Sequence, residues 1–397
     1  MADLKIFTDN IDEIAVGQIM QLIAQPSFRD KKIRIMPDVH AGAGCVIGFT
    51  ADLGEKVIPN IVGVDIGCGM HVIKLGKVNI NLKDLDEFIH QNIPAGFSAN
   101  SKSYNGKFTS KFDFNKLYCL KDIKNLNRCD LEIGTLGGGN HFIEVDIDKE
   151  NNKYLVIHTG SRNLGKQVAT IYQNKAIDYC KNMVQPKVDA KIKELKEQGR
   201  QLDIDKEIKA IYEEFKQYSV PKDLCYLEDK EREEYLHDMK LCQEYAKHNR
   251  EVISKRIMTF LGLQAVEEFE CIHNYIDDKN MVRKGAISAH LGEKVIIPLN
   301  MRDGAIIGTG KGNPDWNESG PHGAGRLLAR GDAKRSLKLE EFQDTMKGIY
   351  TTTVNESTID ESPMAYKPSQ EIIDAIKDTV EITSIIKPVY NFKAGEE

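Results

Sequence analysis

The sequence lacks long hydrophobic runs and any recognisable export signal. No apolar stretch approaches the ~18 residues that a membrane-spanning helix needs. The opening residues, Met1 to Phe7, also lack the basic-then-apolar order of a secretory signal peptide. We therefore expect no membrane contact and a cytoplasmic location, and the 41% hydrophobic content is enough for a substantial core.

Cysteine is scarce. Eight cysteines are spread irregularly over 397 residues, which excludes a disulfide scaffold and leaves reduced thiols or metal ligands as the better interpretation. Only Cys68, which stands between two glycines, has a setting typical of a metal ligand.

The common nucleotide-binding signatures are absent as well. Gly308-Thr-Gly-Lys311-Gly is rich in glycine but does not have the spacing of a P-loop, and no dinucleotide fingerprint occurs. Any nucleotide must therefore bind without a P-loop.

A general excess of positive charge is also missing. The formal net charge is -6, so the protein as a whole offers no attraction to nucleic acid. Between Arg302 and Arg335, however, six basic residues stand against four acidic ones and alternate with glycine. A polyanion is therefore expected to bind only at a local patch.

The hydrophobic pattern predicts an α+β architecture. Short apolar runs that end in glycine turns predict strands at 33–36, 44–50, 61–65, 154–158, 285–288 and 294–298. From about 164 to 261 the pattern changes to charged amphipathic helices, with Pro186 and Pro221 as the expected breaks. Because chemistry-bearing residues lie on both sides of this stretch, we interpret it as a helical insertion or subdomain within one domain.

Asp, Cys and His residues recur beside glycines or at strand ends, which is where sites are usually built. Such residues are Asp65, Cys68, His141, His158 and His273. Carboxylate, thiolate and imidazole ligands together suit zinc, manganese, iron or cobalt. Taken alone, Asp65 and Cys68 also fit a turn-capping carboxylate and a small buried thiol.

Two further segments have a chemical character of their own. In an extended chain Asn140 and Glu144 share one face and His141 lies on the other, which would separate a nucleotide or phosphate contact from a metal contact. In Pro-His322-Gly-Ala-Gly-Arg326, small residues leave the histidine accessible to a bulky electrophile, and the arginine could hold phosphate oxygens. We expect a helix to begin near Gly323 and to add backbone N–H groups for an anion.

Taken together, these segments resemble the RtcB family of RNA-splicing ligases. The resemblance runs from Met36-Pro-Asp38-Val-His40 to Lys387-Pro-Val-Tyr-Asn-Phe-Lys393, with the intervening motifs in the same order. It implies one compact RtcB-like catalytic domain over residues 1–397, with mixed sheets and the helical insertion at about 164–261. The family joins RNA 2',3'-cyclic phosphate or 3'-phosphate ends to 5'-hydroxyl ends, using GTP and Mn2+, in RNA repair or tRNA splicing.

The resemblance also assigns roles to residues. It implies that two Mn2+ ions are held by Asp65, Cys68, His141, His158 and His273, with Cys68 as the bridge. His322 matches the histidine that attacks the GTP α-phosphorus to form a covalent guanylate, and Asp38 matches a residue that would orient it. The implied nucleotide contacts are Asn140, Glu144, Asn300, Tyr366 and Lys393. Arg162 and Arg326 are the arginines assigned to RNA phosphate.

The sequence departs from the family pattern in several ways: it is shorter than many members, and Asn-Glu-Ser-Gly precedes Pro-His322 where a lead rich in serine and cysteine is common. The family's usual Pro-Gly-Ser-Met turn reads Pro298-Leu-Asn300-Met, and Ala329 stands where serine is usual. Two other functions stay open: a two-metal phosphoesterase or nuclease that uses the same ligands without a covalent step, and a catalytically silent RNA-binding homologue. His322 discriminates between them, because only the ligase needs it as a nucleophile.

Overall fold

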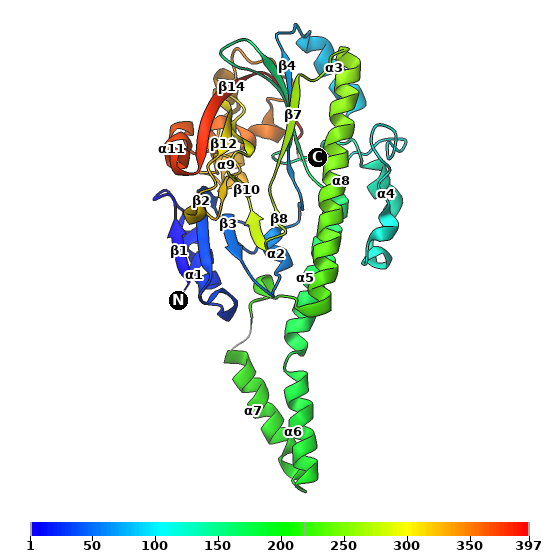
Figure 1. Ribbon diagram of the computed structural model, residues 1–397, viewed down its shortest axis with the longest axis vertical. Coiled ribbons are helices and arrows are strands. Elements are labelled where there is room, and N and C mark those ends of the chain that lie inside the picture. Colours follow the sequence, from blue (N-terminus) through cyan, green and yellow to red (C-terminus); the bar gives the residue numbers. More distant parts are fainter. Residues whose placement is uncertain (1, 218–219, 396–397) are drawn as a thin grey trace.

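The computed structural model describes residues 2–217 and 220–395, and it confirms the α+β class. Its elements form a broad body from which one pair of helices projects (Figure 1). Within the described ranges, no helix has both the length and the hydropathy that a membrane span requires.

The body is built on a seven-stranded sheet in which all neighbours are antiparallel. In spatial order its strands are β11 (Lys294–Asn300), β12 (Gly304–Gly310), β14 (Val380–Lys393), β5 (Phe142–Ile147), β6 (Lys153–Thr159), β4 (Gly69–Gly76) and β7 (Glu267–Ile272).

A second sheet has five strands, and a third has two. The five-stranded sheet has the order β1 (Asp3–Ile6), β2 (Lys32–His40), β3 (Ile47–Asp52), β9 (Met281–Lys284) and β8 (Tyr275–Ile276). Only the β1–β2 pair of this sheet is parallel. The small sheet pairs β10 (Ala286–Ser288) with β13 (Ser319–Pro321). The predicted mixture of sheets is therefore present.

The helices lie around these sheets. Their bounds are α1 (Glu13–Ile23), α2 (Pro59–Val62), α3 (Leu82–Asn92), α4 (Leu126–Leu131), α5 (Arg162–Asn182), α6 (Gln185–Glu197), α7 (Ile204–Gln217), α8 (Asp229–Leu261), α9 (Arg330–Ser336), α10 (Leu339–Thr345) and α11 (Ser369–Ala375).

Alternation along the strands of the large sheet divides its side chains between two cores. On one face Val72 and Val156 pack with side chains of β11 and β12. On the other face Ile143 and Leu155 pack with Ile253 of α8 and with residues of α3. Because the strand period is two residues, alternate side chains of each strand contribute to the same core.

The strand predicted at 61–65 is wrong. Residues 59–62 form the short helix α2 instead, with Pro59 in its first turn and Gly63 at its end with a φ of 96°. Proline fixes a helical φ at that position, and glycine adopts the positive φ that stops the helix without the steric cost of a side chain. The apolar run Ile-Val therefore belongs to a buried helical turn rather than to a sheet.

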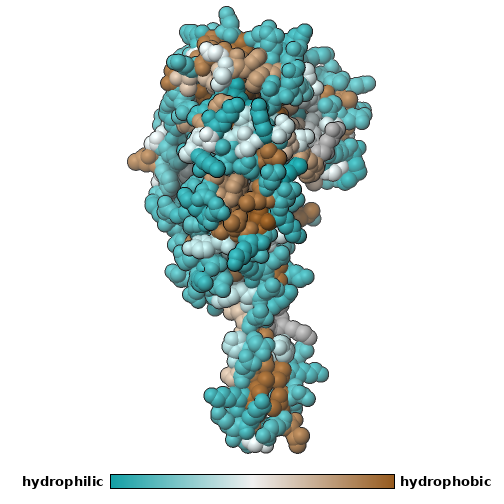
Figure 2. Space-filling model, turned by 90° about the vertical axis from the view of Figure 1, so that its right-hand side faces the viewer, coloured by the Kyte–Doolittle hydropathy of each residue, from teal (hydrophilic) through white to brown (hydrophobic). Residues whose placement is uncertain are grey.

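In the described part of the predicted helical stretch there are four α-helices, which have two different settings. Helices α5 and α8 belong to the body, where Val168 of α5 and Tyr235, Met239 and Tyr245 of α8 contribute to the largest core. Helices α6 and α7 contact each other and project from the body as a hairpin, whose visible surface carries hydrophobic side chains (Figures 1 and 2). Pro186 lies in the first turn of α6, and Pro221 lies between α7 and α8. The extent of the insertion stays a prediction.

Candidate active site

The sheet register brings the predicted metal ligands to one edge of the large sheet. His158 is the next-to-last residue of β6 and pairs with Phe142, which begins β5 directly after His141. Gly69, which begins β4 directly after Cys68, pairs with both Thr159 and Ile272. His273 follows Ile272, and Asp65 lies in the turn before Cys68. Antiparallel neighbours thus deliver ligands from distant parts of the sequence to adjoining strand ends.

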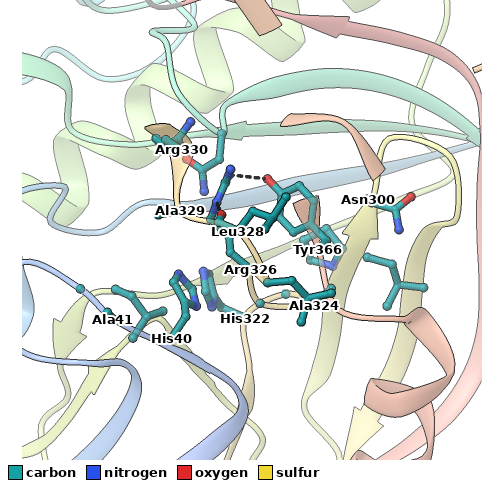
Figure 3. A pocket seen from close by; sticks show the side chains of 18 of the residues that line it. His40, Ala41, Asn300, His322, Ala324, Arg326, Leu328, Ala329, Arg330 and Tyr366 are labelled. Atoms are coloured by element: carbon teal, nitrogen blue, oxygen red, sulfur yellow. Dashed lines mark hydrogen bonds between the residues drawn. The ribbon is translucent and has the colours of Figure 1, made fainter. Parts of the chain in front are cut away.

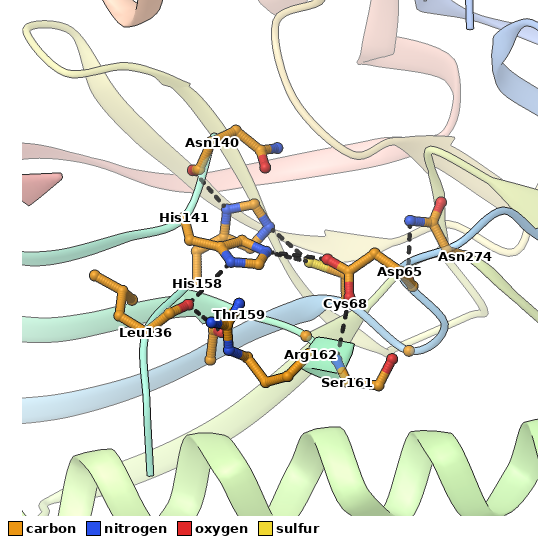
Figure 4. Close-up of polar contacts among 12 residues, drawn as sticks. Asp65, Cys68, Leu136, Asn140, His141, His158, Thr159, Ser161, Arg162 and Asn274 are labelled. Carbon is orange, nitrogen blue, oxygen red and sulfur yellow. Dashed lines mark hydrogen bonds and ion pairs between the residues drawn. The ribbon is translucent and has the colours of Figure 1, made fainter. Parts of the chain in front are cut away.

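The five side chains form two triads that share Cys68. Asp65, Cys68 and His141 make one triad, and Cys68, His158 and His273 make the other, each with its ligand atoms within 4.8 Å of one another. The Sγ atom of Cys68 lies 3.4 Å from His141 Nε2 and 3.3 Å from His158 Nε2. His141 Nε2 lies 3.0 Å from Asp65 Oδ2 (Figure 4).

Backbone carbonyls fix the orientation of two of the imidazoles. The Nδ1–H of His141 donates to the Leu136 carbonyl at 3.0 Å, and that of His158 donates to the Asn140 carbonyl at 3.2 Å (Figure 4). Each ring therefore turns its Nε2 lone pair toward Cys68, as in protein metal sites where the second nitrogen is hydrogen-bonded. His273 Nδ1 is buried without a hydrogen-bond partner among the described residues. These donors fit a metal centre.

The electrostatics of the cluster also suit a cation. Burial lowers the pKa of His158 and His273 well below its ordinary value, and the neighbouring imidazoles lower it further. Burial raises the pKa of Asp65, but the hydrogen bond and charge of His141 outweigh it and hold the pKa at about 2. Burial and the Asp65 charge raise the pKa of Cys68 well above the usual range. The protein thus offers the neutral imidazoles of His158 and His273 and the carboxylate of Asp65, and a coordinated metal deprotonates such a thiol.

A cavity of about 680 Å³ adjoins this cluster. Its walls include seven residues predicted for catalysis or nucleotide binding, together with the metal-ligand candidate His158. The seven are Asn140, Glu144, Asn300, His322, Arg326, Tyr366 and Lys393. The glycine-rich segment 323–325 lines the cavity beside His322 (Figure 3).

His322 is held from behind by Asp38. Asp38 Oδ2 accepts from His322 Nδ1 at 2.7 Å and from the His322 backbone N–H at 3.1 Å, and Asp38 is fully buried. Nε2 of His322 is therefore the nitrogen that carries a lone pair. The rings of His322 and His273 have centroids 4.8 Å apart, so the histidine joins the cavity to the metal-ligand cluster.

The helix predicted to begin near Gly323 is absent. Residues 322–325 form an irregular turn, and helix α9 begins only at Arg330. Gly325 has a φ of 77°, and a Cβ atom there would lie 2.4 Å from the Asp38 carbonyl oxygen. The small residues after His322 therefore serve a close approach between this turn and β2, and they do not form a helix start.

Three residues that the resemblance assigns to nucleotide or RNA contacts form hydrogen bonds or ion pairs within the protein. The Asn300 amide oxygen accepts from the backbone N–H groups of Arg302 and Asp303 within its turn. Arg326 forms an ion pair with buried Glu361 at 3.0 Å. Arg162, which does not line the cavity, donates to Thr135 Oγ1 and to the Gly96 carbonyl.

Glu144 and Lys393 lie on adjoining strands of the cavity wall. Asn391 donates to the Glu144 carboxylate from β14, and the register pairs Asn391 with Glu144. Burial raises the pKa of Glu144 to about 7, although the Lys393 charge and the Asn391 hydrogen bond lower it. Asn140, Phe142 and Glu144 line the cavity. His141 turns toward Cys68 instead.

Sequence reasoning missed several residues of the site. His40 and Arg330 line the cavity, and Glu361 lies behind it in contact with Arg326, Arg330, Tyr366 and Lys393. In the sequence, Glu361 stands five residues before the predicted nucleotide contact Tyr366, in Asp-Glu-Ser-Pro-Met-Ala-Tyr, and this closeness is the one hint that it belongs to the site. Nothing in that pattern indicates that the carboxylate is buried, because burial depends on segments distant in sequence.

The fold and the site define an α+β protein in which a cluster of candidate metal ligands that shares one cysteine adjoins a large cavity lined by a carboxylate-held histidine. The family model described as "tRNA-splicing ligase RtcB" matches residues 18–394. The chain therefore belongs to the RtcB family.

Individual relatives match over nearly the full length. The chain is 29% identical to the RNA-splicing ligase RtcB of Escherichia coli K12 over 427 residues, which cover 98% of this chain and 96% of the relative. It is 26% identical to the tRNA-splicing ligase RtcB of Archaeoglobus fulgidus, with 92% of this chain and 88% of the relative covered. The corresponding protein of Methanococcus maripaludis is also 26% identical, with 94% and 90% covered.

Proposed function

We propose that this protein is a GTP- and Mn2+-dependent RNA ligase that acts in the cytoplasm in RNA repair or tRNA splicing. It joins RNA 2',3'-cyclic phosphate or 3'-phosphate ends to 5'-hydroxyl ends through a histidine–guanylate intermediate. Membership of the RtcB family and the names of the relatives support an RNA ligase. The same metal-ligand residues would also serve a two-metal phosphoesterase or remain in a catalytically silent homologue. We therefore base the choice of a ligase on the geometry around His322.

The observation that carries the proposal is the hydrogen bond between His322 Nδ1 and buried Asp38. It fixes the tautomer with a lone pair on Nε2, and the turn of small residues leaves space beside the ring for a bulky phosphorus centre. A histidine activated and oriented by a carboxylate is an established nucleophile arrangement. A simple two-metal hydrolase has no need of it.

The residues that would hold the two Mn2+ ions are Asp65, Cys68, His141, His158 and His273, in the two triads that share Cys68. When bound, the ions would neutralise phosphate charge and stabilise the developing charge on the leaving group. The protein itself contributes imidazoles already fixed in the required tautomer, so little reorganisation is needed when the ions enter.

The cavity wall supplies groups suited to GTP. Guanine presents N–H donors beside a carbonyl acceptor, and the Glu144 carboxylate and the Lys393 ammonium complement that edge. The Tyr366 ring lines the same cavity and offers a stacking surface. Asn140 and Asn300 complete the proposed nucleotide contacts.

A 2',3'-cyclic phosphate is first opened by water, which breaks the bond from phosphorus to O2' and leaves a 3'-phosphate. From a 3'-phosphate end the chemistry balances in three transfers. His322 Nε2 attacks the α-phosphorus, an N–P bond forms, and the bond to the β-phosphate breaks to release pyrophosphate. An RNA 3'-phosphate oxygen next takes the guanylyl group from His322. The RNA 5'-hydroxyl finally attacks the activated 3'-phosphate and displaces GMP. Arg162 and Arg326 are the proposed contacts to RNA phosphate.

The test is a guanylylation assay with GTP labelled at the α-phosphate and Mn2+. We expect acid-labile label on the wild-type protein and none on His322→Ala, because the other described histidines that line the cavity, His40 and His158, are held by backbone carbonyls and not by a carboxylate. The matched control is His237→Ala, which replaces a histidine on α8 that hydrogen-bonds the Lys116 carbonyl outside the cavity. It should take up label like the wild type. Undiminished label on His322→Ala would overturn the proposal, as would failure of the wild type to join cyclic-phosphate and 5'-hydroxyl RNA ends.

A further inference from the structure

Glu361 lies directly behind the cavity wall, in contact with four residues that line it, although no motif pointed to it. The residue ends a 3-10 helix at Glu356–Glu361 and is 2% exposed. Four side chains from three separate segments converge on its carboxylate. Each of the four also lines the cavity.

The two carboxylate oxygens have different partners. Oε2 accepts from Tyr366 Oη at 2.6 Å and from Lys393 Nζ at 2.7 Å. Oε1 accepts from Arg326 Nη1 at 3.0 Å and from Arg330 Nη1 at 2.6 Å. Tyr366 and Lys393 belong to the proposed base side of the nucleotide site, whereas the two arginines belong to the basic segment proposed to hold RNA phosphate.

The charge balance explains why the carboxylate stays ionised in a buried place. Burial raises the pKa of Glu361, but the charges of Lys393, Arg330 and Arg326 outweigh it and hold the pKa at about 2. A carboxylate offers about four acceptor positions, and four donors occupy them. Replacement of one member of such a buried network leaves the others with uncompensated charge.

We infer that Glu361 is a positioning residue that links the nucleotide subsite to the RNA-phosphate subsite, one through each carboxylate oxygen. It holds Tyr366 and Lys393 in place for the base and Arg326 and Arg330 in place for phosphate. The inference rests on the proposed function, because the two subsites are defined by it.

The neighbouring carboxylate provides a matched comparison. Asp360 is equally buried, and its side chain contacts Arg330 at 2.7 Å and Lys334 at 3.7 Å. The described contacts of the Asp360 side chain do not include Tyr366 or Lys393. Asp360→Asn should therefore disturb the phosphate side alone, whereas Glu361→Gln should disturb both sides.

The experiment measures two affinities of the full-length protein. Titration calorimetry gives the Kd for GTP, and fluorescence anisotropy gives the Kd for a labelled single-stranded RNA with a 3'-phosphate. We expect Glu361→Gln to weaken both by at least about tenfold, because loss of a charged partner in a buried network costs that much or more. Asp360→Asn should weaken RNA binding and leave GTP binding within about twofold. A Glu361→Gln protein that loses neither affinity, or only one, would overturn the inference.

A folding defect in Glu361→Gln is separated from a positioning role by two further measurements. The metal triads contain no partner of Glu361, so an intact Mn2+ stoichiometry would show a folded site. A double-mutant cycle of Lys393→Met and Arg330→Met then leaves Glu361 in place. If Glu361 links the two sides, the effects of Lys393→Met and Arg330→Met on the Kd for GTP are non-additive. If the two residues are not linked, the effect of the double substitution equals the product of the two single effects within about twofold.

The two proposals fail in distinguishable ways. A wild-type protein that binds GTP and RNA but takes no label from GTP would overturn the proposed function and still allow the Glu361 comparison. A wild type that takes label, together with an unchanged Glu361→Gln, would overturn the inference alone.

Discussion

Asp38 holds His322 through a single carboxylate oxygen, which accepts from both the ring Nδ1–H and the backbone N–H of the histidine. The other oxygen, Oδ1, is buried without a hydrogen-bond partner among the described residues. The pair joins β2 to the turn after β13, and the two residues are 284 positions apart in the sequence. The orientation of the proposed nucleophile is therefore a tertiary property.

Asp38→Asn tests that orientation. The amide can present its N–H₂ group to Nδ1, which favours the wrong tautomer and turns the lone pair of His322 away from the cavity. We expect guanylylation to slow by about 10- to 100-fold, the range typical for loss of a group that orients a functional histidine. The rate of label uptake from GTP is the measurement. Asp52→Asn, at an exposed position at the end of β3, is the control and should react like the wild type.

The shared cysteine predicts a pattern of metal stoichiometry. His141 belongs to one triad and His273 to the other, whereas Cys68 belongs to both. We expect two Mn2+ per chain in the wild type, one in His141→Ala, one in His273→Ala, and weakened binding of both ions in Cys68→Ala. Elemental analysis after equilibrium dialysis measures this. Cys271→Ala removes a buried thiol outside the triads and should keep both ions. Full retention of both ions in Cys68→Ala would contradict a shared ligand.

The buried Glu144 carboxyl predicts a pH-dependent stability difference. Burial raises its pKa from the ordinary 4.5 to about 7, so between these values the folded protein binds a proton that the unfolded chain has released. The stabilisation from this group is complete below about pH 4.5 and is lost as the pH rises through 7. Glu144→Gln keeps an acceptor for Asn391 and cannot ionise. It should gain about 3 kcal/mol relative to the wild type between pH 4.5 and 7.

Urea unfolding of the metal-free protein across that pH range measures the difference. The control is Glu214→Gln, a change at an exposed position on α7. Its free energy of unfolding should follow the wild-type curve. A Glu144→Gln curve parallel to that of the wild type would show that the carboxyl is not held protonated.

Asn300 stands where the family usually has serine, and the structure gives it a local role. Its amide oxygen accepts from two backbone N–H groups, and its Nδ2 donates to Asp303 at 2.9 Å. Asn300→Ala should therefore lower the free energy of unfolding by about 1 kcal/mol, as for other lost side-chain caps. Asn300→Ser keeps one hydrogen-bond acceptor, so its free energy of unfolding should fall by less. Thermal unfolding measures stability, and a raised KM for GTP in Asn300→Ala would show the proposed nucleotide contact as well. Equal stability of Asn300→Ala and the wild type would contradict the capping role.

The sequence predicted the parts of the fold that local patterns encode. Alternation and short apolar runs identified the strands that became β2, β6 and β11, and charged amphipathic periodicity identified α5 to α8. The prediction failed at 61–65, where an apolar run of two residues after a proline forms a helical turn. Such a run is too short for its period to distinguish a strand from a helix.

By itself the sequence determined the chemical inventory of this protein: which side chains can bind a cation, which histidine stands among small residues, and which family the motifs resemble. Those properties depend on residue type and on near neighbours. The tertiary structure alone decided which atoms meet. Register between antiparallel strands placed five ligands in two triads that share Cys68, and packing of distant segments placed Asp38 behind His322 and Glu361 behind the cavity wall. Burial and pairing of this kind depend on long-range contacts, which a local pattern of residues does not contain.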